Sequence, residues 1–297
     1  MIADEIKSYG GDILKFAGDA LIVEWTHCML PEGEKQQPIT LLAALCASKL
    51  VDKCSDYPVT APQDGKHIAT LNIHCALGYG NVVGAHVGDM DRMEYIILGS
   101  TIQQIAVGLD QSKLGQVVAS PEAINSLRNT VDFDGDLIKD GEYTLIAFKD
   151  NQKFQPKETF IRPTKSFERE PVSSQCSDWS LEEMEALQRK MSRYVHSVVY
   201  SDEFAEDDDG CDTRLRKTES ELRDVFTVFI QPEMKNLDIN GIAAGDQEIL
   251  EILNSIMFLV NAEVTHFQAH LRQFIVDDKG LVVIANFGLR GSTFPNM

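Results

Sequence analysis

The stretch GGDILKFAGDALIVEW, Gly10 to Trp25, holds two apolar runs around a short polar break. Ile13–Phe16 and Ala20–Trp25 are rich in β-branched and aromatic residues, and Ala17-Gly18-Asp19 between them favours a tight turn. This pattern predicts a β-hairpin with Asp19 at its tip.

A carboxylate at a hairpin tip has two readings. Asp tolerates turn geometry and stays solvated there, so the hairpin alone favours an ordinary turn residue. The alternative is a ligand of a hard cation, since Mg²⁺ is commonly held by one or two carboxylates while substrate phosphates and waters complete its shell. Other stretches of the sequence are needed to distinguish a turn residue from a cation ligand.

Composition narrows the class of protein. The chain has 297 residues, of which 43% are hydrophobic, enough for about two domains with packed cores. Asp and Glu number 46 against 27 Lys and Arg, a net charge of -19. This excess of negative charge argues against a nucleic-acid partner or an anionic membrane surface.

The cysteines and the N-terminus favour a reducing, intracellular location. The 6 cysteines show neither CxxC spacing nor a His partner at metal-ligand distance, so we expect free thiols. The first residues lack the basic and apolar regions of a signal peptide. The longest apolar run, Ile249 to Val260, is interrupted by polar residues and too short to cross a bilayer. We expect a cytoplasmic protein without a membrane span.

Hydrophobic periodicity predicts the remaining elements. Apolar side chains recur every three to four positions in Ile39–Lys53, and a second helical stripe runs through Leu181–Val199, with Ser180 as cap and Glu183 at capping-box spacing. The predicted strands are Thr70–Tyr79, Val82–Val83, Tyr95–Leu98, Val117–Ala119, Gly141–Phe148 and Asp224–Ile230; further helices are expected at 100–109, from 120 and at 246–267.

The opening pattern returns near the C-terminus. QFIVDDKGLVVIANF, Gln273 to Phe287, predicts a second hairpin. Between the two patterns the chain is polar and acidic, including the run Glu203 to Asp212. We therefore expect a first domain over residues 1–149, an acidic linker with one amphipathic helix over 150–221, and the first half of a second domain over 222–297.

Four stretches together resemble a known family. GGDILKFAGDALIVEW, a strand ending in LGYG, EYIILGSTIQQIA and VVASPEA resemble the class III nucleotidyl cyclase catalytic domain, closest to the first domain of bicarbonate-responsive soluble adenylyl cyclases. ELRDVFTVFIQPE and HLRQFIVDDKGLVVIANFG resemble the start of the second domain in that tandem family. The resemblance covers Ile2 to Phe148 and Glu221 to about Leu289.

The resemblance implies a fold and a reaction. It implies an α+β fold, a ferredoxin-like antiparallel sheet with helices on one face, and two tandem domains that pair head to tail as a pseudo-dimer. ATP, or GTP in a guanylyl cyclase, would lie between them with two Mg²⁺ or Mn²⁺ ions. Attack of the ribose 3′-hydroxyl on the α-phosphate then gives the 3′,5′-cyclic nucleotide and pyrophosphate, a two-metal phosphoryl transfer.

Residue by residue, the resemblance implies roles for the first hairpin. Asp19 matches the second metal-binding Asp, while the first belongs to a strand expected before Met1. Lys15 matches the Lys that helps to form an anion site in the bicarbonate-responsive branch. The positions of the family's transition-state Asn and Arg read Gln103 and Val107, and the purine-selecting Asp position reads Ile96.

The second domain departs further from the family pattern. Gln231 stands where a metal-binding Asp would be, which fits a domain that contributes base contacts. The adenine-contacting Lys falls at Gln273, beside Arg272. Asp277 and Asp278 are expected to be turn residues, and this domain's Asn and Arg would follow Met297. Each lost donor of that kind removes roughly 3 to 4 kcal/mol of transition-state stabilisation, so this chain alone is expected to be a very poor cyclase.

Several alternatives remain open. The chain could be a guanylyl cyclase, a degenerate module that senses a nucleotide or an anion without chemistry, or, more weakly, a relative of GGDEF-type cyclases through Gly10-Gly11-Asp12. A bicarbonate response would have only one cation, because the family's partner Arg falls at or beside Ala106. We expect weak or no stimulation by bicarbonate.

Overall fold

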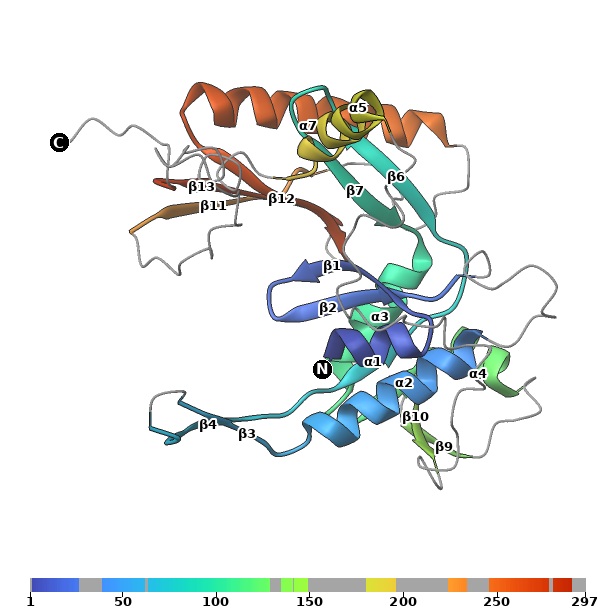
Figure 1. Ribbon diagram of the computed structural model, residues 1–297. Helices are drawn as coiled ribbons and strands as arrows, with labels where there is room; N and C mark the ends of the chain where they lie inside the picture. Colours follow the sequence, from blue (N-terminus) through green and yellow to red (C-terminus); the bar gives the residue numbers. More distant parts are fainter. Residues whose placement is uncertain are drawn as a thin grey trace. The chain divides into compact units, whose positions relative to one another are not determined.

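The computed structural model describes residues 2–26, 39–61, 64–128, 135–140, 142–148, 180–195, 224–233, 246–277 and 280–289 (Figure 1). The chain forms two compact units. Unit 1 comprises residues 1–81 and 103–174, and unit 2 comprises residues 82–102 and 175–297. Residues 82–102 fall inside the first domain expected from the sequence, yet they cluster with the C-terminal residues.

The chain order of the elements is as follows. Up to residue 98 they are α1 (Ile2–Ser8), β1 (Asp12–Ala17), β2 (Ala20–Glu24), α2 (Ile39–Cys54), β3 (Tyr57–Thr60), β4 (His67–Leu71), β5 (Cys75–Leu77), β6 (Val83–Gly88) and β7 (Met93–Leu98). They continue with α3 (Ser100–Gln111), β8 (Val117–Ala119), α4 (Pro121–Arg128), β9 (Gly135–Asp140), β10 (Tyr143–Phe148), α5 (Leu181–Ser192), β11 (Phe226–Ile230), α7 (Gln247–His266), β12 (His270–Asp277) and β13 (Gly280–Phe287).

Unit 1 is organised around α2. Twelve of the 16 residues of this helix are buried. Its own side chains are apolar or small on nearly all sides, so it can be covered all round. It packs with α1 and α4 and against a four-stranded sheet of order β5-β8-β10-β9. In that sheet β5 and β8 run parallel, and the other pairs are antiparallel. The β1–β2 hairpin forms a separate two-stranded sheet whose Ile13, Leu21 and Val23 pack on the same core.

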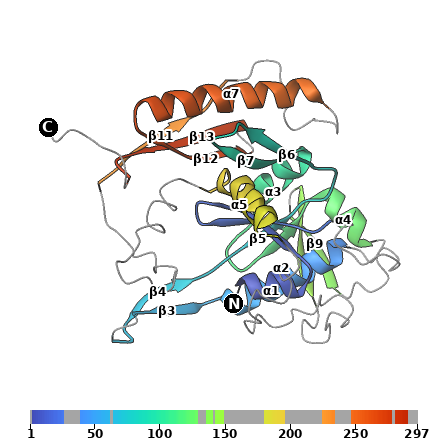
Figure 2. The ribbon, with the colours of Figure 1, turned by 45° about the horizontal axis from the view of Figure 1, so that its top comes forward.

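Unit 2 combines two hairpins with one long helix. The sheet has the order β11-β13-β12, and all its pairs are antiparallel. The 20-residue α7 lies along this sheet and the β6–β7 hairpin in both views (Figures 1 and 2). Leu253, Met257 and Phe274 are completely buried in the core that these elements share with Val87 and Leu98.

The two units repeat one local motif, beginning at a helix end. After α1, Gly10 adopts a left-handed φ of 76°, and the following amide donates to the carbonyl of Ile6 at 3.0 Å. After α7, Gln268 adopts a left-handed φ of 55°, and the following amide donates to the carbonyl of Val264 at 2.9 Å. Both ends are Schellman motifs, which satisfy the last carbonyls of a helix and turn the chain sharply.

Each Schellman motif leads into a hairpin with a bulge at the matching position. In β1, Ile13 pairs with Val23 and Lys15 with Ile22, so Leu14 is the extra residue. In β12, Leu271 pairs with Ala285 and Gln273 with Ile284. Arg272 is the extra residue there. Because the bulges match, residues of the two hairpins can be paired by their strand register, independently of how similar their sequences are.

The α+β fold class predicted from the sequence is confirmed. Both hairpins form where expected, the helix predicted at Ile39–Lys53 is α2, and the capping box predicted at Ser180 and Glu183 is present at the start of α5. The single strand predicted at Thr70–Tyr79 is wrong: the structure breaks it into β4, which pairs with β3, and β5. No sequence pattern predicted α1, a short helix in which Ile6 is the buried residue.

Candidate functional site

The tip of the first hairpin presents Asp19 to solvent. Ala17 pairs with Ala20, and Gly18 and Asp19 form the turn between them. Gly18 has φ 66°, a conformation that favours glycine, and nothing lies within 4 Å of where its Cβ would be. The Asp19 side chain is exposed, so its carboxylate oxygens are accessible to an ion.

The bulge in β1 determines which face of the hairpin carries Lys15. A bulge places two residues opposite one and so resets the alternation of the strand. Ile13 packs against the core of unit 1, while Lys15, two positions later and after the extra residue Leu14, is half-buried. Lys15 and Asp19 thus come from one hairpin, four residues apart.

The second hairpin carries its cation one position earlier. Leu271 and Phe274 are buried, whereas Arg272 is exposed and Gln273 is half-buried. By register Gln273 corresponds to Lys15 and Arg272 to Leu14. The polar position predicted for base contact therefore holds an amide, with a guanidinium beside it.

The second hairpin is longer at its tip than the first. Its register continues to the pair Asp277 and Gly280, two pairs beyond the position that matches Ala17 and Ala20. Counted from the bulge, Asp277 falls where Asp19 does, but Asp277 is paired with Gly280 in the strands, whereas Asp19 lies in a turn. Asp278 lies outside the described residues. Gln231 follows the last residue of β11 directly and is exposed.

The open end of the first hairpin holds two facing carboxylates that the sequence analysis missed. Asp12 and Glu24 are register partners on β1 and β2. Burial, and then the Asp12 charge, raise the pKa of Glu24. The turn alone does not predict this pairing: a two-residue turn at Gly18 and Asp19 would set Asp12 opposite Trp25, and the bulge at Leu14 shifts its partner to Glu24. The second hairpin has His270 opposite Asn286 at the same register position.

Gln104 joins three segments of unit 1. Its side-chain oxygen accepts hydrogen bonds from the backbone N–H of Tyr79 at 2.9 Å and from the hydroxyl of Ser120 at 2.7 Å. Its backbone carbonyl accepts from the Tyr143 hydroxyl at 2.7 Å. The preceding residue, Gln103, is exposed. Gln104 holds the start of α4 and the end of β5 together, a role that no sequence pattern predicted.

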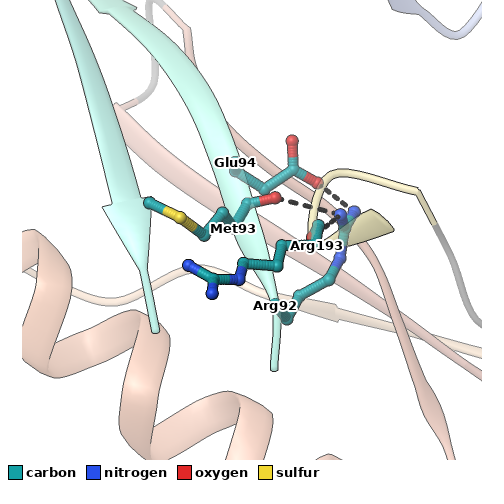
Figure 3. A network of polar contacts seen from close by, with 4 residues as sticks. All are labelled: Arg92, Met93, Glu94 and Arg193. Atoms are coloured by element: carbon teal, nitrogen blue, oxygen red, sulfur yellow. Dashed lines mark hydrogen bonds and ion pairs between the residues drawn. The ribbon is translucent and has the colours of Figure 1, made fainter. Parts of the chain in front are cut away.

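A polar anchor ties the end of α5 to β7 in unit 2 (Figure 3). Arg92 donates from Nη2 to Glu94 at 2.6 Å and from Nη1 to the carbonyls of Met93 at 3.0 Å and Arg193 at 3.1 Å. The Met93 amide also donates to the Arg193 carbonyl, at 2.9 Å. The side chains of Arg92 and Glu94 are only 12% and 13% exposed, so this ion pair is better shielded than a surface pair.

The described residues contain neither a cluster of metal ligands nor a helix that could span a membrane. Within them, no three His, Cys, Asp or Glu side chains gather in a way that could hold a metal ion. Asp19 as a metal ligand, and Lys15, Arg272 and Gln273 as nucleotide or anion contacts, therefore stay predictions. In the part of the chain that is described, no helix combines the length and apolarity needed to cross a membrane.

The described cysteines agree with the expectation of free thiols. Cys46 and Cys54 are buried and Cys75 is half-buried. All three are free thiols. Burial raises the pKa of Cys46 and of Cys75 to about 12, so neither thiol is reactive at neutral pH. Cys28, Cys176 and Cys211 lie outside the described residues.

Comparison with known proteins gives relatives along the whole chain. Adenylate cyclase type 10 of Mus musculus is 22% identical over 99% of this chain, and the proteins of that name from Rattus norvegicus and Homo sapiens are 22% and 20% identical over the same share. The chain spans 17% of the length of each of these relatives. No family model matches the chain.

Among solved structures, the crystal structure of the guanylyl cyclase Cya2 matches at 20% identity and a TM-score of 0.34. The match covers 49% of this chain and 73% of that chain. The relatives of known sequence confirm the family resemblance that the motifs predicted.

Proposed function

The chain is a relative of the class III nucleotidyl cyclases, and from that premise we propose that it is part of an enzyme that converts ATP to 3′,5′-cyclic AMP and pyrophosphate. The observation that carries the proposal is the relationship to adenylate cyclase type 10 over 99% of this chain. The repeated helix and bulged hairpin support it, because two tandem copies of one domain start would produce that repeat.

In this proposal Asp19 holds a divalent ion, Mg²⁺ or Mn²⁺, together with the nucleotide phosphates. One exposed carboxylate on a short turn suits such an ion, which takes most of its other ligands from phosphates and water. When bound, the ion lowers the pKa of the ribose hydroxyl and neutralises phosphate charge. The protein's part is to place the carboxylate at the tip of the hairpin.

The basic side chains of the hairpins supply positive charge to an otherwise acidic protein. The chain carries a net charge of -19, so an anionic nucleotide needs local cations. Lys15 on the first hairpin and Arg272 on the second would serve that purpose, and Gln273 would donate or accept a hydrogen bond at the purine. An amide presents both a donor and an acceptor, which leaves adenine and guanine both possible.

A second candidate is a module that binds a nucleotide or an anion without turnover. It is favoured by one observation: Gln103 is exposed and Val107 is apolar where the family pattern carries the Asn and Arg that act on the transition state. Bicarbonate belongs to this candidate as an anion for Lys15. Binding of bicarbonate that disappears in Lys15→Ala, without any cyclic nucleotide formed, would support it.

The test is incubation of the full chain with radiolabelled ATP or GTP and Mn²⁺, with chromatographic separation of the cyclic nucleotide. The expected result is slow formation of cyclic AMP and pyrophosphate, which stops when the divalent ion is chelated. Asp19→Ala is expected to abolish the product, whereas Asp110→Ala, an exposed carboxylate on α3, is the matched control and should leave it unchanged. Metal-dependent binding of ATP without any cyclic product would favour the second candidate.

A further inference from the structure

The last turn of α5 carries a basic sequence in a strongly acidic chain. Arg189 and Lys190 stand three and two residues before Ser192, and Arg193 follows it. The first turn of the same helix is acidic, with Glu182 and Glu183. Kinases select serines through the charge pattern around them, and a large class requires basic residues at these two preceding positions. The sequence around Ser192 has that pattern.

Apart from the anchor at its C-terminal end, the helix that carries Ser192 is held weakly. It is 12 residues long, and none of its residues is buried. Isolated helices of this length are marginal in water, and segments with few buried contacts open locally at low free-energy cost. A kinase that binds its substrate as an extended strand therefore gains access to residues 189–193 without unfolding a core.

The hydroxyl of Ser192 lies next to the anchor that ties α5 to β7. Its Oγ donates to the carbonyl of Arg189 at 2.9 Å. The carbonyl of the next residue, Arg193, accepts the hydrogen bonds from Met93 and Arg92 that form the anchor. One residue later, the Tyr194 hydroxyl lies 2.9 Å from Nδ1 of His86 on β6.

We propose that Ser192 is a phosphorylation site for a serine kinase that selects basic residues, and that phosphorylation loosens the anchor between α5 and the β6–β7 hairpin. In the transfer, the bond between the γ-phosphorus of ATP and the β,γ-bridging oxygen breaks and a bond from Ser192 Oγ to that phosphorus forms. The hydroxyl proton passes to a carboxylate of the kinase, and ADP leaves.

The physical effect follows from the position of Ser192 at the C-terminus of α5. A phosphoserine carries about -1.5 to -2 charges, and negative charge is unfavourable where the helix dipole is negative. The ester oxygen also loses the proton that Ser192 donates to Arg189. Both effects destabilise the last helical turn, whose next carbonyl is the acceptor in the anchor.

The experiment exposes the full chain to Mg²⁺, ATP and the catalytic subunit of a cyclic-AMP-dependent protein kinase, and locates phosphate by peptide mass spectrometry. Phosphate is expected on Ser192. The double variant Arg189→Gln with Lys190→Gln is expected to lose at least roughly tenfold in rate at that residue, because the selecting charges are gone. Arg193→Gln is the matched control: it removes a cation outside the two selecting positions and should keep the rate.

Hydrogen exchange gives the readout of the anchor. The Met93 amide should exchange roughly two- to fivefold faster in the phosphorylated chain, the range expected for an unfavourable charge at a helix end. The amides of β7 residues deeper in the β6–β7 hairpin should not change. Three results would overturn the proposal: no phosphate on Ser192, phosphate there only after the chain is unfolded, or unchanged exchange at Met93 in the fully phosphorylated chain.

Discussion

Phe16 and Phe274 occupy the same register position in the two bulged hairpins, yet Phe16 is 65% exposed and Phe274 is completely buried. The difference lies in the covering helix. The α7 helix contributes four buried residues to the core around Phe274, whereas α1 contributes one buried residue, Ile6, to the core beneath the first hairpin. The ring at this register position is thus packed in unit 2 and faces solvent in unit 1.

Substitution of these two phenylalanines should have very different effects on stability. Phe274→Ala removes a fully buried ring and is expected to cost about 3 to 5 kcal/mol of unfolding free energy. Phe16→Ala removes a mostly exposed ring and should change stability by less than about 1 kcal/mol. Denaturant unfolding followed by circular dichroism measures both. Equal losses in the two variants would show that the register alignment does not reflect the packing.

The left-handed helix end after α1 gives a second prediction. Gly10 has φ 76°, and nothing lies within 4 Å of where its Cβ would be, so a substitution there acts through the backbone alone. Gly10→Ala should cost roughly 1 to 2 kcal/mol. Gly10→Asn should cost less, because Asn adopts this conformation more readily. Thermal unfolding of the two variants tests the order, and a more stable Ala variant would contradict the Schellman motif.

The facing carboxylates Asp12 and Glu24 predict an effect of pH. The pKa of Glu24 is raised in the folded chain, so the folded state binds more protons than the unfolded state as pH rises above the ordinary value of 4.5. The contribution of Glu24 to stability is therefore present at low pH and is lost as pH rises through the folded pKa.

Glu24→Gln should accordingly stabilise the protein at neutral pH. The gain is about 0.2 to 1 kcal/mol, the range for a like-charged cross-strand pair, and it should shrink as pH falls toward 4.5. Unfolding measured at several pH values checks this. Glu122→Gln on α4, an exposed side chain, is the control. A gain in Glu24→Gln that is independent of pH would rule out the charge as its cause.

The hydrogen bonds of Gln104 predict a contrast between neighbours on α3. Gln104→Leu leaves the Tyr79 amide and the Ser120 hydroxyl without their acceptor, and Ser120 is fully buried. The expected loss is about 1 to 3 kcal/mol. Gln103→Leu replaces an exposed side chain and should be nearly neutral. Urea unfolding compares the two, and a neutral Gln104→Leu would show that water replaces the lost acceptor.

Local patterns in the sequence predicted much of the fold, and the reasons are specific. The turn at Gly18 and Asp19, the capping box at Ser180 and the apolar periodicity of α2 are encoded within a few residues. The break between β4 and β5 was missed because alternating residues run across it, and the two strands differ in their partners: β4 pairs with β3 and β5 with β8.

The site was predicted less completely than the fold. The residues on the first hairpin were found through the family resemblance, whereas Gln104 and the anchor of Arg92 depend on contacts between distant segments. The two bulges also escaped notice. An extra residue in a strand is visible in the register but not in the alternation of side chains, and only the register shows that Gln273, not Arg272, matches Lys15.

The central claim is that Asp19 holds a divalent ion together with a nucleotide. The most direct measurement is a Mn²⁺ titration with 3′-deoxy-ATP, which cannot cyclise, followed by the relaxation rate of water protons. Asp19→Ala should bind the ion at least roughly tenfold more weakly than the unmodified chain, equivalent to about 1.4 kcal/mol, while Asp110→Ala should match it. Equal Mn²⁺ binding by the unmodified chain and Asp19→Ala would contradict the account.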